Sequence, residues 1–238
     1  MLTLVATPIG NLGDISPRAV ETLRGAEVIA CEDTRRTRAL LSHLGIPRPA
    51  VFVSYRQGNE ERTGAYLLEL VREGRAVVLC SDGGYPGVSD PGYRLLAAAV
   101  EAGLDVDVIP GPSAVPVALL LSGLPTSSYT FKGYPPRKGG ARRRFFEQEK
   151  DLPHTLIVFE SPYRVAATLG DALAALGDRR GAVCMEMTKA FQRVRRGYLS
   201  ELLADTEKTP RGEVTIVIAG NHPRFTAGSS HDGAIRDA

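Results

Sequence analysis

Short apolar runs alternate with helix-length amphipathic segments through the first half of this 238-residue chain. The runs are strand-length and rich in Val, Ile and Leu, which is typical of strands buried on both faces of a parallel sheet. Such strands need a crossover connection, and the amphipathic segments between them are long enough to be helices. The sequence therefore predicts an α/β fold, with strands over residues 2–6, 28–30, 51–54, 76–80 and 106–109.

The expected helices carry recognisable start and stop signals. Ser16 precedes Pro17, so a capping hydroxyl stands directly before a proline that suits the first helical position. Glycines that can adopt a left-handed conformation follow three other helical segments, at Gly45, Gly74 and Gly103. These signals predict helices over residues 16–25, 34–44, 59–72 and 93–102.

The character of the sequence changes after Pro110-Gly111-Pro112, where we place a domain boundary. We expect a first α/β domain over residues 1–112, a second over 113–222, and a disordered polar tail over 223–238. Fewer helices separate the strands of the second domain, so several of its strand pairs should be antiparallel. The expected strands there are residues 129–132, 155–159, 182–187, 194–198 and 214–219.

The composition is that of a globular protein, with 43% hydrophobic and 24% charged residues. No apolar run approaches the ~20 residues of a membrane span, and the N-terminus lacks the pattern of a signal peptide. We therefore expect a cytoplasmic protein without a membrane partner. Cys31, Cys80 and Cys184 are far apart and lie in apolar runs, which indicates buried thiols. No Cys or His spacing suits a metal site.

Four unusual loops follow strands in the first half: residues 7–12, 32–35, 81–92 and 110–114. The carboxyl ends of parallel strands gather at one edge of the sheet, so these loops should form a shared ligand cleft. The loop from Ser81 to Gly92 spends four glycines and two prolines on a rigid shape. Neither GxGxxG after a strand nor GxxxxGK[ST] occurs, which argues against dinucleotide and P-loop sites.

These loops also carry motifs in a recognisable order: TPIGNLGDISPRA, EDTRRT, SDGGYPGVSDPG, PGPSA, SGLP, ESPYR and TKAFQRVRRG. Over residues 1–222 the series resembles the tetrapyrrole methylase superfamily, and within it the methyltransferases of small-subunit ribosomal RNA. The resemblance implies a class III methyltransferase fold, in which each chain has two α/β domains with a cofactor cleft between them. It also implies that the protein is a homodimer. It further implies S-adenosylmethionine as cofactor and a cytidine 2′-hydroxyl of 16S ribosomal RNA, free or in the 30S subunit, as acceptor.

The residues are consistent with that cofactor, which is a folded cation. Asp82 can accept hydrogen bonds or balance positive charge, although an Asx-turn is the alternative reading. Glycines beside it allow the backbone to approach a ligand, and Ser113 stands at a helix start. By resemblance, Pro8, Tyr85 and Phe159 line the same pocket. The predicted cofactor residues are Pro8, Ile9, Gly10, Ser81, Asp82, Gly83, Gly84, Tyr85, Ser113, Ala114 and Phe159.

A ribose hydroxyl is a weak nucleophile, so a base should assist its attack on the sulfonium methyl group. Glu32, Glu186 and Lys189 are the catalytic candidates. For the segment around Glu32 the alternative is structural, because Asp33 is well placed to cap a helix and to pair with Arg35.

Basic residues suited to RNA phosphates stand at Arg35 and Arg36 and in a second group at Arg137, Lys138, Arg142, Arg143 and Arg144. Gly139 and Gly140 within the second group indicate a mobile loop that could close over RNA. The alternative is an ordinary solvated face.

The chain departs from the family pattern at Tyr163 and Gln192, where relatives usually have His and an acidic residue, and at Tyr85, where Thr is usual. Two further hypotheses stay open, the first because the superfamily includes such enzymes and the second because of the departures at Tyr163 and Gln192. One is a methyltransferase for a tetrapyrrole or other small molecule, and the other is a ribosome-binding assembly factor that hardly catalyses.

Overall fold

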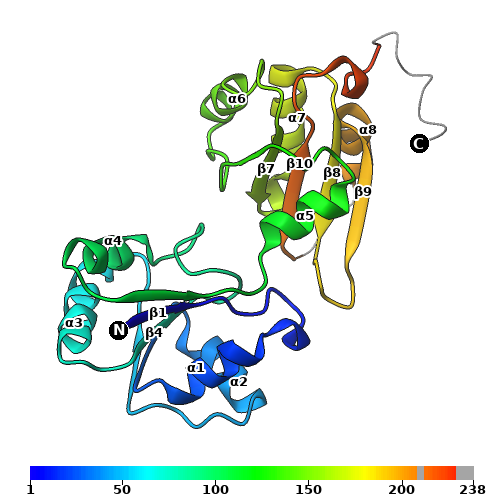
Figure 1. Cartoon of the computed structure of the whole chain (residues 1–238). Helices are drawn as coiled ribbons and strands as arrows, with labels where there is room; N and C mark the ends of the chain where they lie inside the picture. Colours follow the sequence, from blue (N-terminus) through cyan, green and yellow to red (C-terminus); the bar gives the residue numbers. More distant parts are fainter. Residues whose placement is uncertain (208–211, 229–238) are drawn as a thin grey trace. The chain divides into compact units, whose positions relative to one another are not determined.

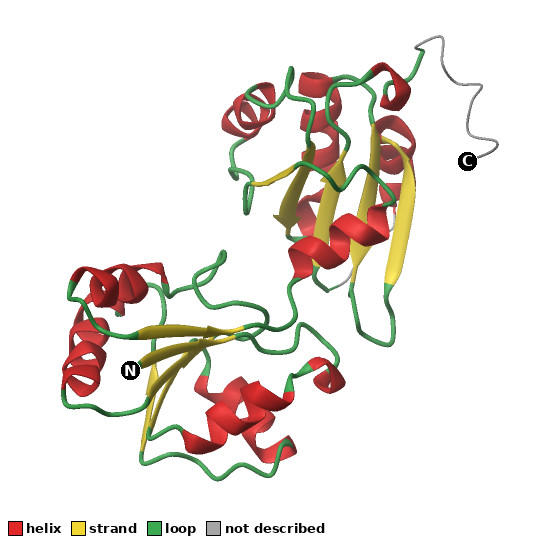
Figure 2. Cartoon of the chain, viewed as in Figure 1, coloured by secondary structure: helices red, strands yellow, loops and turns green. Residues whose placement is uncertain are grey.

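The computed structural model describes residues 1–207 and 212–228, and the chain divides into two compact units, Met1–Ser113 and Ala114–Ala238. Each unit is built around one five-stranded sheet with helices packed against it (Figures 1 and 2). The predicted α/β class is confirmed for both units. The cofactor cleft expected between them stays a prediction.

The first unit contains an entirely parallel sheet in the order β3-β2-β4-β1-β5. Each predicted strand is present, within one residue at either end. The strands are β1 (Leu2–Val5), β2 (Val28–Cys31), β3 (Val51–Ser54), β4 (Val77–Cys80) and β5 (Val106–Ile109). The helices are α1 (Pro17–Gly25), α2 (Thr34–His43), α3 (Glu60–Arg72) and α4 (Tyr93–Glu101), with a short 3-10 turn η1 (Leu12–Asp14) after β1.

Side-chain alternation along these strands divides the first unit into three layers. Leu2 and Leu4 pack with residues of α3 and α4 on one face of the sheet. Val5 and Ile29 pack with residues of α1 and α2 on the other face. Because both faces are covered, the inner strands β2 and β4 are apolar and fully buried, whereas the edge strand β5 carries the exposed Asp107.

The helix signals read from the sequence act as expected. The Ser16 hydroxyl accepts a hydrogen bond from the Ala19 amide at 3.1 Å and caps α1. Gly45, Gly74 and Gly103 have φ values of 63°, 81° and 66°, the left-handed conformation that ends a helix.

The second unit contains a mixed sheet in the order β6-β7-β10-β8-β9, in which only the β6–β7 pair is parallel. The predicted antiparallel pairing is therefore confirmed. The strands are β6 (Tyr129–Phe131), β7 (Thr155–Glu160), β8 (Arg180–Met185), β9 (Arg193–Tyr198) and β10 (Val214–Ile218). The helices are α5 (Ala114–Ser122), α6 (Gly139–Glu147), α7 (Val165–Leu176) and α8 (Leu199–Ala204); the 3-10 turns are η2 (Pro162–Arg164), η3 (Asp205–Glu207) and η4 (Pro223–Phe225).

Helices cover both faces of this second sheet as well. Val115, Ala118 and Leu119 of α5 pack on one face. Phe146 of α6 packs on the other, in a cluster that α7 and α8 complete. Phe146 is fully buried and anchors α6 in this core.

Two expectations differ from the structure. The segment with Gly139 and Gly140 is the first turn of helix α6 rather than a mobile loop. Amphipathic spacing decides this, because Arg142 and Phe146 fall one turn apart on the buried face. The predicted disordered tail is ordered at its start, where η4 is followed by a β-bridge between Thr226 and Arg179. Residues 229–238 lie outside the described residues.

The three cysteines are buried free thiols, as predicted. Burial raises the pKa of Cys31 and of Cys184 to about 11, so both thiols are protonated at neutral pH. Within residues 1–207 and 212–228, no cluster of three His, Cys, Asp or Glu side chains could hold a metal ion. No helix of that same part of the chain has the length and apolar character needed to cross a membrane.

Candidate functional site

Connections leave the neighbouring strands β1 and β4 toward opposite faces of the first sheet. The chain passes from β1 to α1 on one face and from β4 to α4 on the other. In open parallel sheets, ligands bind outside the carboxyl ends of the strands at such a switch point. The carboxyl ends of β1 and β4 are therefore where the fold favours a ligand site.

The loops after β1 and β4 are joined directly to each other. Thr7 and Gly84 form an isolated antiparallel bridge, with both N–H···O distances at 2.9 Å. The Thr7 hydroxyl donates to the Ser81 carbonyl at 3.1 Å, and the buried Ser81 hydroxyl donates to the Gly84 carbonyl at 3.2 Å. Ser81 therefore shapes the loop from inside.

Glycines are needed where these two loops meet. A Cβ on Gly83 would lie 3.3 Å from the Pro8 carbonyl oxygen and 3.6 Å from the Ile9 Cα. Gly84 has φ of 83°, a conformation that side chains disfavour. Pro8, Ile9, Gly83 and Gly84, all predicted as cofactor residues, are thus brought together.

Asp82 connects the same loop to the start of helix α2. Its Oδ1 accepts from the Asp33 amide at 3.1 Å, and its Oδ2 pairs with an Arg36 guanidinium nitrogen at 3.2 Å. The contacts run between elements, so Asp82 does not merely close a local Asx-turn. The expected cap is also present: the Asp33 carboxylate accepts from the Arg35 amide at 2.8 Å and binds the Arg35 side chain through both oxygens.

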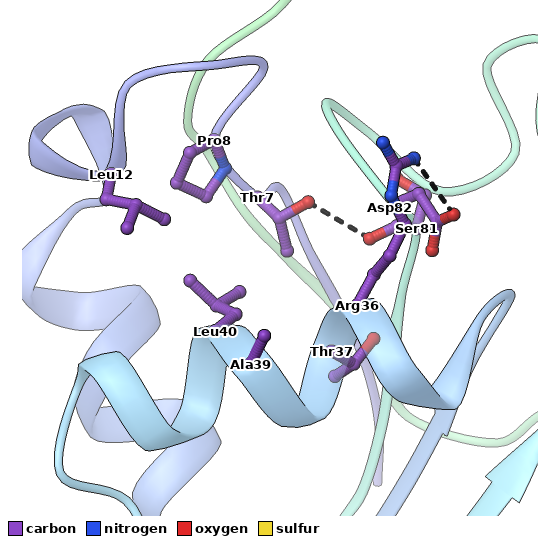
Figure 3. Close-up of a pocket in the computed structure, with 9 residues that line it drawn as sticks. All are labelled: Thr7, Pro8, Leu12, Arg36, Thr37, Ala39, Leu40, Ser81 and Asp82. Carbon is purple, nitrogen blue, oxygen red and sulfur yellow. Dashed lines mark hydrogen bonds and ion pairs between the residues drawn. The ribbon is translucent and has the colours of Figure 1, made fainter.

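A pocket of about 270 Å³ opens between these elements (Figure 3). One end is apolar, with Leu40 and Ala39 of α2 directed toward Pro8 and Leu12. The other end is polar and is closed by Thr7, Arg36, Thr37, Ser81 and Asp82. The pocket thus combines apolar walls with a few convergent polar groups, which is typical of small-molecule sites.

Glu32 is a half-buried carboxyl group that directly precedes Asp33, whose amide donates to Asp82. Burial raises its pKa, and the nearby negative charge of Asp82 raises it further, while Arg36 opposes the shift. The Asp33 carboxyl behaves in the opposite way, because its hydrogen bonds from Arg35 lower its pKa. Of the two carboxyl groups, Glu32 is the stronger proton acceptor.

Tyr85 has a structural role in the first unit. Its phenolic oxygen accepts a hydrogen bond from the Gly111 amide at 3.0 Å and so connects the loops after β4 and β5. Joining these two loops is a physical reason for a tyrosine at this position.

The other two catalytic candidates lie in the second unit and bind each other. Lys189 Nζ donates to Glu186 at 2.8 Å and to Glu213 at 3.2 Å. Hydrogen bonds from Lys189 and from the Glu213 amide lower the pKa of Glu186. Burial opposes protonation of Lys189, but hydrogen bonds with both glutamates outweigh it and raise the lysine pKa. Neither group is a good base at neutral pH.

The remaining predicted cofactor residues are distributed along the chain. Gly10 is exposed in the loop after β1, and Ser113 ends the first unit. Ala114 begins α5 of the second unit, where Phe159 packs edge-on against Phe131 at 4.7 Å and Tyr134 at 5.7 Å. Their joint contribution to one site stays a prediction.

Two of the departures from the family pattern lie on the second unit. Gln192 accepts a hydrogen bond from the Thr188 amide at 2.7 Å within the turn between β8 and β9. Tyr163 in η2 is 86% exposed. Gln192 therefore stabilises a turn, whereas the Tyr163 ring is open to solvent.

The predicted basic group on α6 divides into exposed and buried members. Arg137, Lys138, Arg143 and Arg144 are exposed. Arg142 is 7% exposed, and its guanidinium is bound to Asp171 of α7 at 2.8 Å. The prediction of Arg142 as an exposed RNA contact is therefore wrong, because its side chain joins two helices.

We expect Asp171→Ala to destabilise the second unit by about 3–5 kcal/mol, because it leaves the buried Arg142 charge without its partner. The matched control is Arg143→Ala, which removes the exposed partner of the same carboxylate, 3.3 Å away, and should cost about 0–1 kcal/mol. Urea unfolding followed by circular dichroism compares the variants. Equal midpoints for Asp171→Ala and wild type would contradict the assigned role.

Five residues that line the pocket were not among the predicted site residues: Thr7, Leu12, Thr37, Ala39 and Leu40. The sequence did offer one signal. Arg36, a predicted site residue, and Leu40 are one helical turn apart, so they share a face of α2. Nothing in the sequence indicated that this face of α2 would meet Leu12.

Comparisons with known proteins agree with this architecture. A profile of the family described as Tetrapyrrole (Corrin/Porphyrin) Methylases matches residues 1–203. The chain is 45% identical over 221 residues to the ribosomal RNA small subunit methyltransferase I of Halalkalibacterium halodurans, covering 92% of this chain and 76% of that protein. Its identity to the protein of the same name from Thermotoga maritima is 43% over 220 residues, covering 92% and 98%.

Solved structures show the same fold at low identity. The uroporphyrin-III-C-methyltransferase of Thermus thermophilus superposes with a TM-score of 0.62 at 22% identity, covering 92% of this chain and 93% of that one. A diphthine synthase superposes with a TM-score of 0.68 at 15% identity, covering 92% and 89%. The sequence match and the shared fold together establish that this chain is a member of the tetrapyrrole methylase family.

Proposed function

We propose that this protein transfers a methyl group from S-adenosylmethionine to the 2′-hydroxyl of a cytidine in small-subunit ribosomal RNA. The observation that carries the proposal is the joining of the loops after β1 and β4 at the switch point of the first sheet, where Thr7 bridges Gly84 and Asp82 binds the start of α2. The pKa of Glu32, next to Asp33 in the sequence, is raised by burial and by the charge of Asp82, which supports the proposal. The ribosomal RNA methyltransferases that share more than 40% of their residues with this chain support the class of acceptor.

The residues around Asp82 fit a cationic cofactor. The carboxylates of Asp33 and Asp82 both act electrostatically on Glu32, and these two carboxylates are paired with Arg35 and Arg36. A positively charged ligand would offset the repulsion among the carboxylates. Bound there, S-adenosylmethionine would supply an electrophilic methyl group, and the backbone of the Asp82–Gly84 segment would orient it.

Glu32 is the base that we assign to the reaction. It would receive the proton of the ribose hydroxyl as the hydroxyl oxygen bonds to the methyl carbon. Bound S-adenosylmethionine would supply that methyl group, with the electron pair of the broken carbon–sulfur bond kept on a neutral thioether. A carboxylate with a raised pKa accepts a proton more readily than an ordinary one, so the position of Glu32 favours this role.

Exposed arginines supply the proposed contacts to RNA phosphates. The Arg35 side chain is 86% exposed, and the bidentate pair with Asp33 fixes its direction. Arg137, Lys138, Arg143 and Arg144 present further positive charge on the second unit. Such contacts would make binding strongly dependent on salt. The homodimer and the cytoplasmic location expected from the sequence stay predictions.

The test is incubation of the protein with methyl-labelled S-adenosylmethionine and either 30S subunits, naked 16S RNA or small tetrapyrroles. Label on the 2′-oxygen of one cytidine in the subunit or the RNA is the expected result. Transfer to a tetrapyrrole would replace the proposal with small-molecule methylation. Tight cofactor binding without transfer to any acceptor would indicate an assembly factor instead.

A further inference from the structure

We propose that the pocket between α2 and the loop after β1 is the subsite for the pyrimidine base of the acceptor nucleotide, with Arg36 reading the edge of the base. This inference rests on the proposed function, because it places the acceptor of that reaction. The pocket lies wholly within the first unit.

The size and shape of the pocket suit one flat ring system. Its volume of about 270 Å³ is at the small end of ligand sites, which are typically about 300–1,000 Å³. Pro8 and Leu12 face Ala39 and Leu40 across the apolar end (Figure 3). Enzymes that act on a nucleotide of folded RNA or DNA commonly turn the base out of its stack and hold it between apolar side chains.

The polar end of the pocket favours a neutral base over a phosphate group. Asp82 is part of the wall. Its charge and that of Asp33 both act on Glu32, so three carboxyl groups interact near this end of the pocket. These carboxylates would repel a phosphate. This is why we assign Arg36 to the base, whereas the sequence suggested a phosphate contact, and leave phosphate binding to the more exposed Arg35.

Arg36 is held in place for such a contact. Asp82 binds one guanidinium nitrogen at 3.2 Å, and the remaining N–H groups of an arginine stay available as donors. The side chain is 61% exposed, so a ligand can reach it. Cytosine presents two neighbouring acceptors, O2 and N3, to such donors, whereas uracil carries a hydrogen on N3. A guanidinium at this place therefore favours cytosine.

The position relative to the proposed cofactor loop also fits. Asp82 and Ser81 belong both to the wall of the pocket and to the loop that we assign to S-adenosylmethionine. A nucleotide whose base occupies the pocket would lie beside that loop. Methyl transfer needs the two reactants held in contact and in line.

The test uses Ala39→Phe, which fills the apolar end from an exposed helix position, with Ser42→Phe on the same helix outside the pocket as the matched control. We expect Ala39→Phe to lower kcat/KM for methylation of 30S subunits by at least about 100-fold, because displacement of the acceptor by even 1 Å has an effect of that order. The Kd of S-adenosylmethionine should be unchanged in both variants, and Ser42→Phe should methylate normally.

A direct binding arm uses cytidine 5′-monophosphate as the probe. It should shift the methyl resonances of Leu12 and Leu40 in the wild-type protein and in Ser42→Phe, but not in Ala39→Phe. Uridine 5′-monophosphate should bind more weakly than the cytidine probe, and Arg36→Lys should remove that preference because a lysine lacks the planar fork of donors.

The outcomes distinguish this inference from the proposed function. If Ala39→Phe methylates normally, or if it loses S-adenosylmethionine binding instead, the subsite is wrong while RNA methylation stands. A second outcome is that the wild-type protein methylates no RNA, while the cytidine probe shifts Leu12 and Leu40 in wild type and Ser42→Phe but not in Ala39→Phe. In that case the subsite stands and the proposed reaction is wrong.

Discussion

Replacing Glu32 with glutamine is expected to slow methyl transfer by about 10²–10⁴-fold, the usual contribution of a general base. Glutamine keeps the size of the side chain but cannot take the proton of the hydroxyl. The Kd of S-adenosylmethionine should rise far less than the rate falls, because the Asp82 carboxylate remains. Single-turnover transfer of labelled methyl groups to 30S subunits measures the chemical step, and Glu61→Gln, an exposed carboxyl on α3, is the matched control.

The pH dependence of the wild-type enzyme provides a second readout. The reaction needs ionised Glu32, so the rate should fall as the pH drops through the pKa of this group. Burial and the charge of Asp82 raise that pKa. The decline should therefore begin at a higher pH than for an unperturbed glutamate, whose pKa is about 4.3. A Glu32→Gln enzyme that keeps the wild-type rate and the same acidic limb would exclude Glu32 as the base.

Replacing Asp82 with alanine should weaken S-adenosylmethionine binding by at least about 30-fold, or about 2 kcal/mol, the size of a hydrogen bond to a charged group. The variant loses the negative charge proposed to face the cofactor. It also loses the contacts to the Asp33 amide and to Arg36 that connect the loop to α2. Isothermal titration calorimetry measures the affinity, and circular dichroism checks that the fold is kept.

Asp82→Asn separates the two roles of this residue. Asparagine keeps an oxygen that can accept from the Asp33 amide, but it carries no charge. If the charge of Asp82 holds the cofactor, the asparagine and alanine variants should be weakened to similar extents. If the anchoring of α2 is what matters, asparagine should restore most of the affinity. Unchanged cofactor binding in the alanine variant would place the cofactor elsewhere.

Much of the fold followed from local patterns in the sequence. Apolar runs and helix caps depend on residues that are close in the chain, so the strands of the first unit and the stop signals at Gly45, Gly74 and Gly103 were predicted to within a residue or two. Helix α6 was misjudged because two glycines and a run of arginines indicate a loop. Burial of Arg142 against Asp171 outweighs that local preference.

The sequence by itself determined the α/β class, the edge of the sheet at which the glycine-rich loops meet, and the family, because these depend on periodicity and on motifs in a fixed order. Only the tertiary structure decided which side chains meet. It paired Asp82 with Arg36 and placed Leu12 opposite Leu40. It also raised the pKa of Glu32 and of Lys189 and lowered the pKa of Glu186. Burial and the distance between charges fix such properties, and both arise only when segments far apart in the chain pack together.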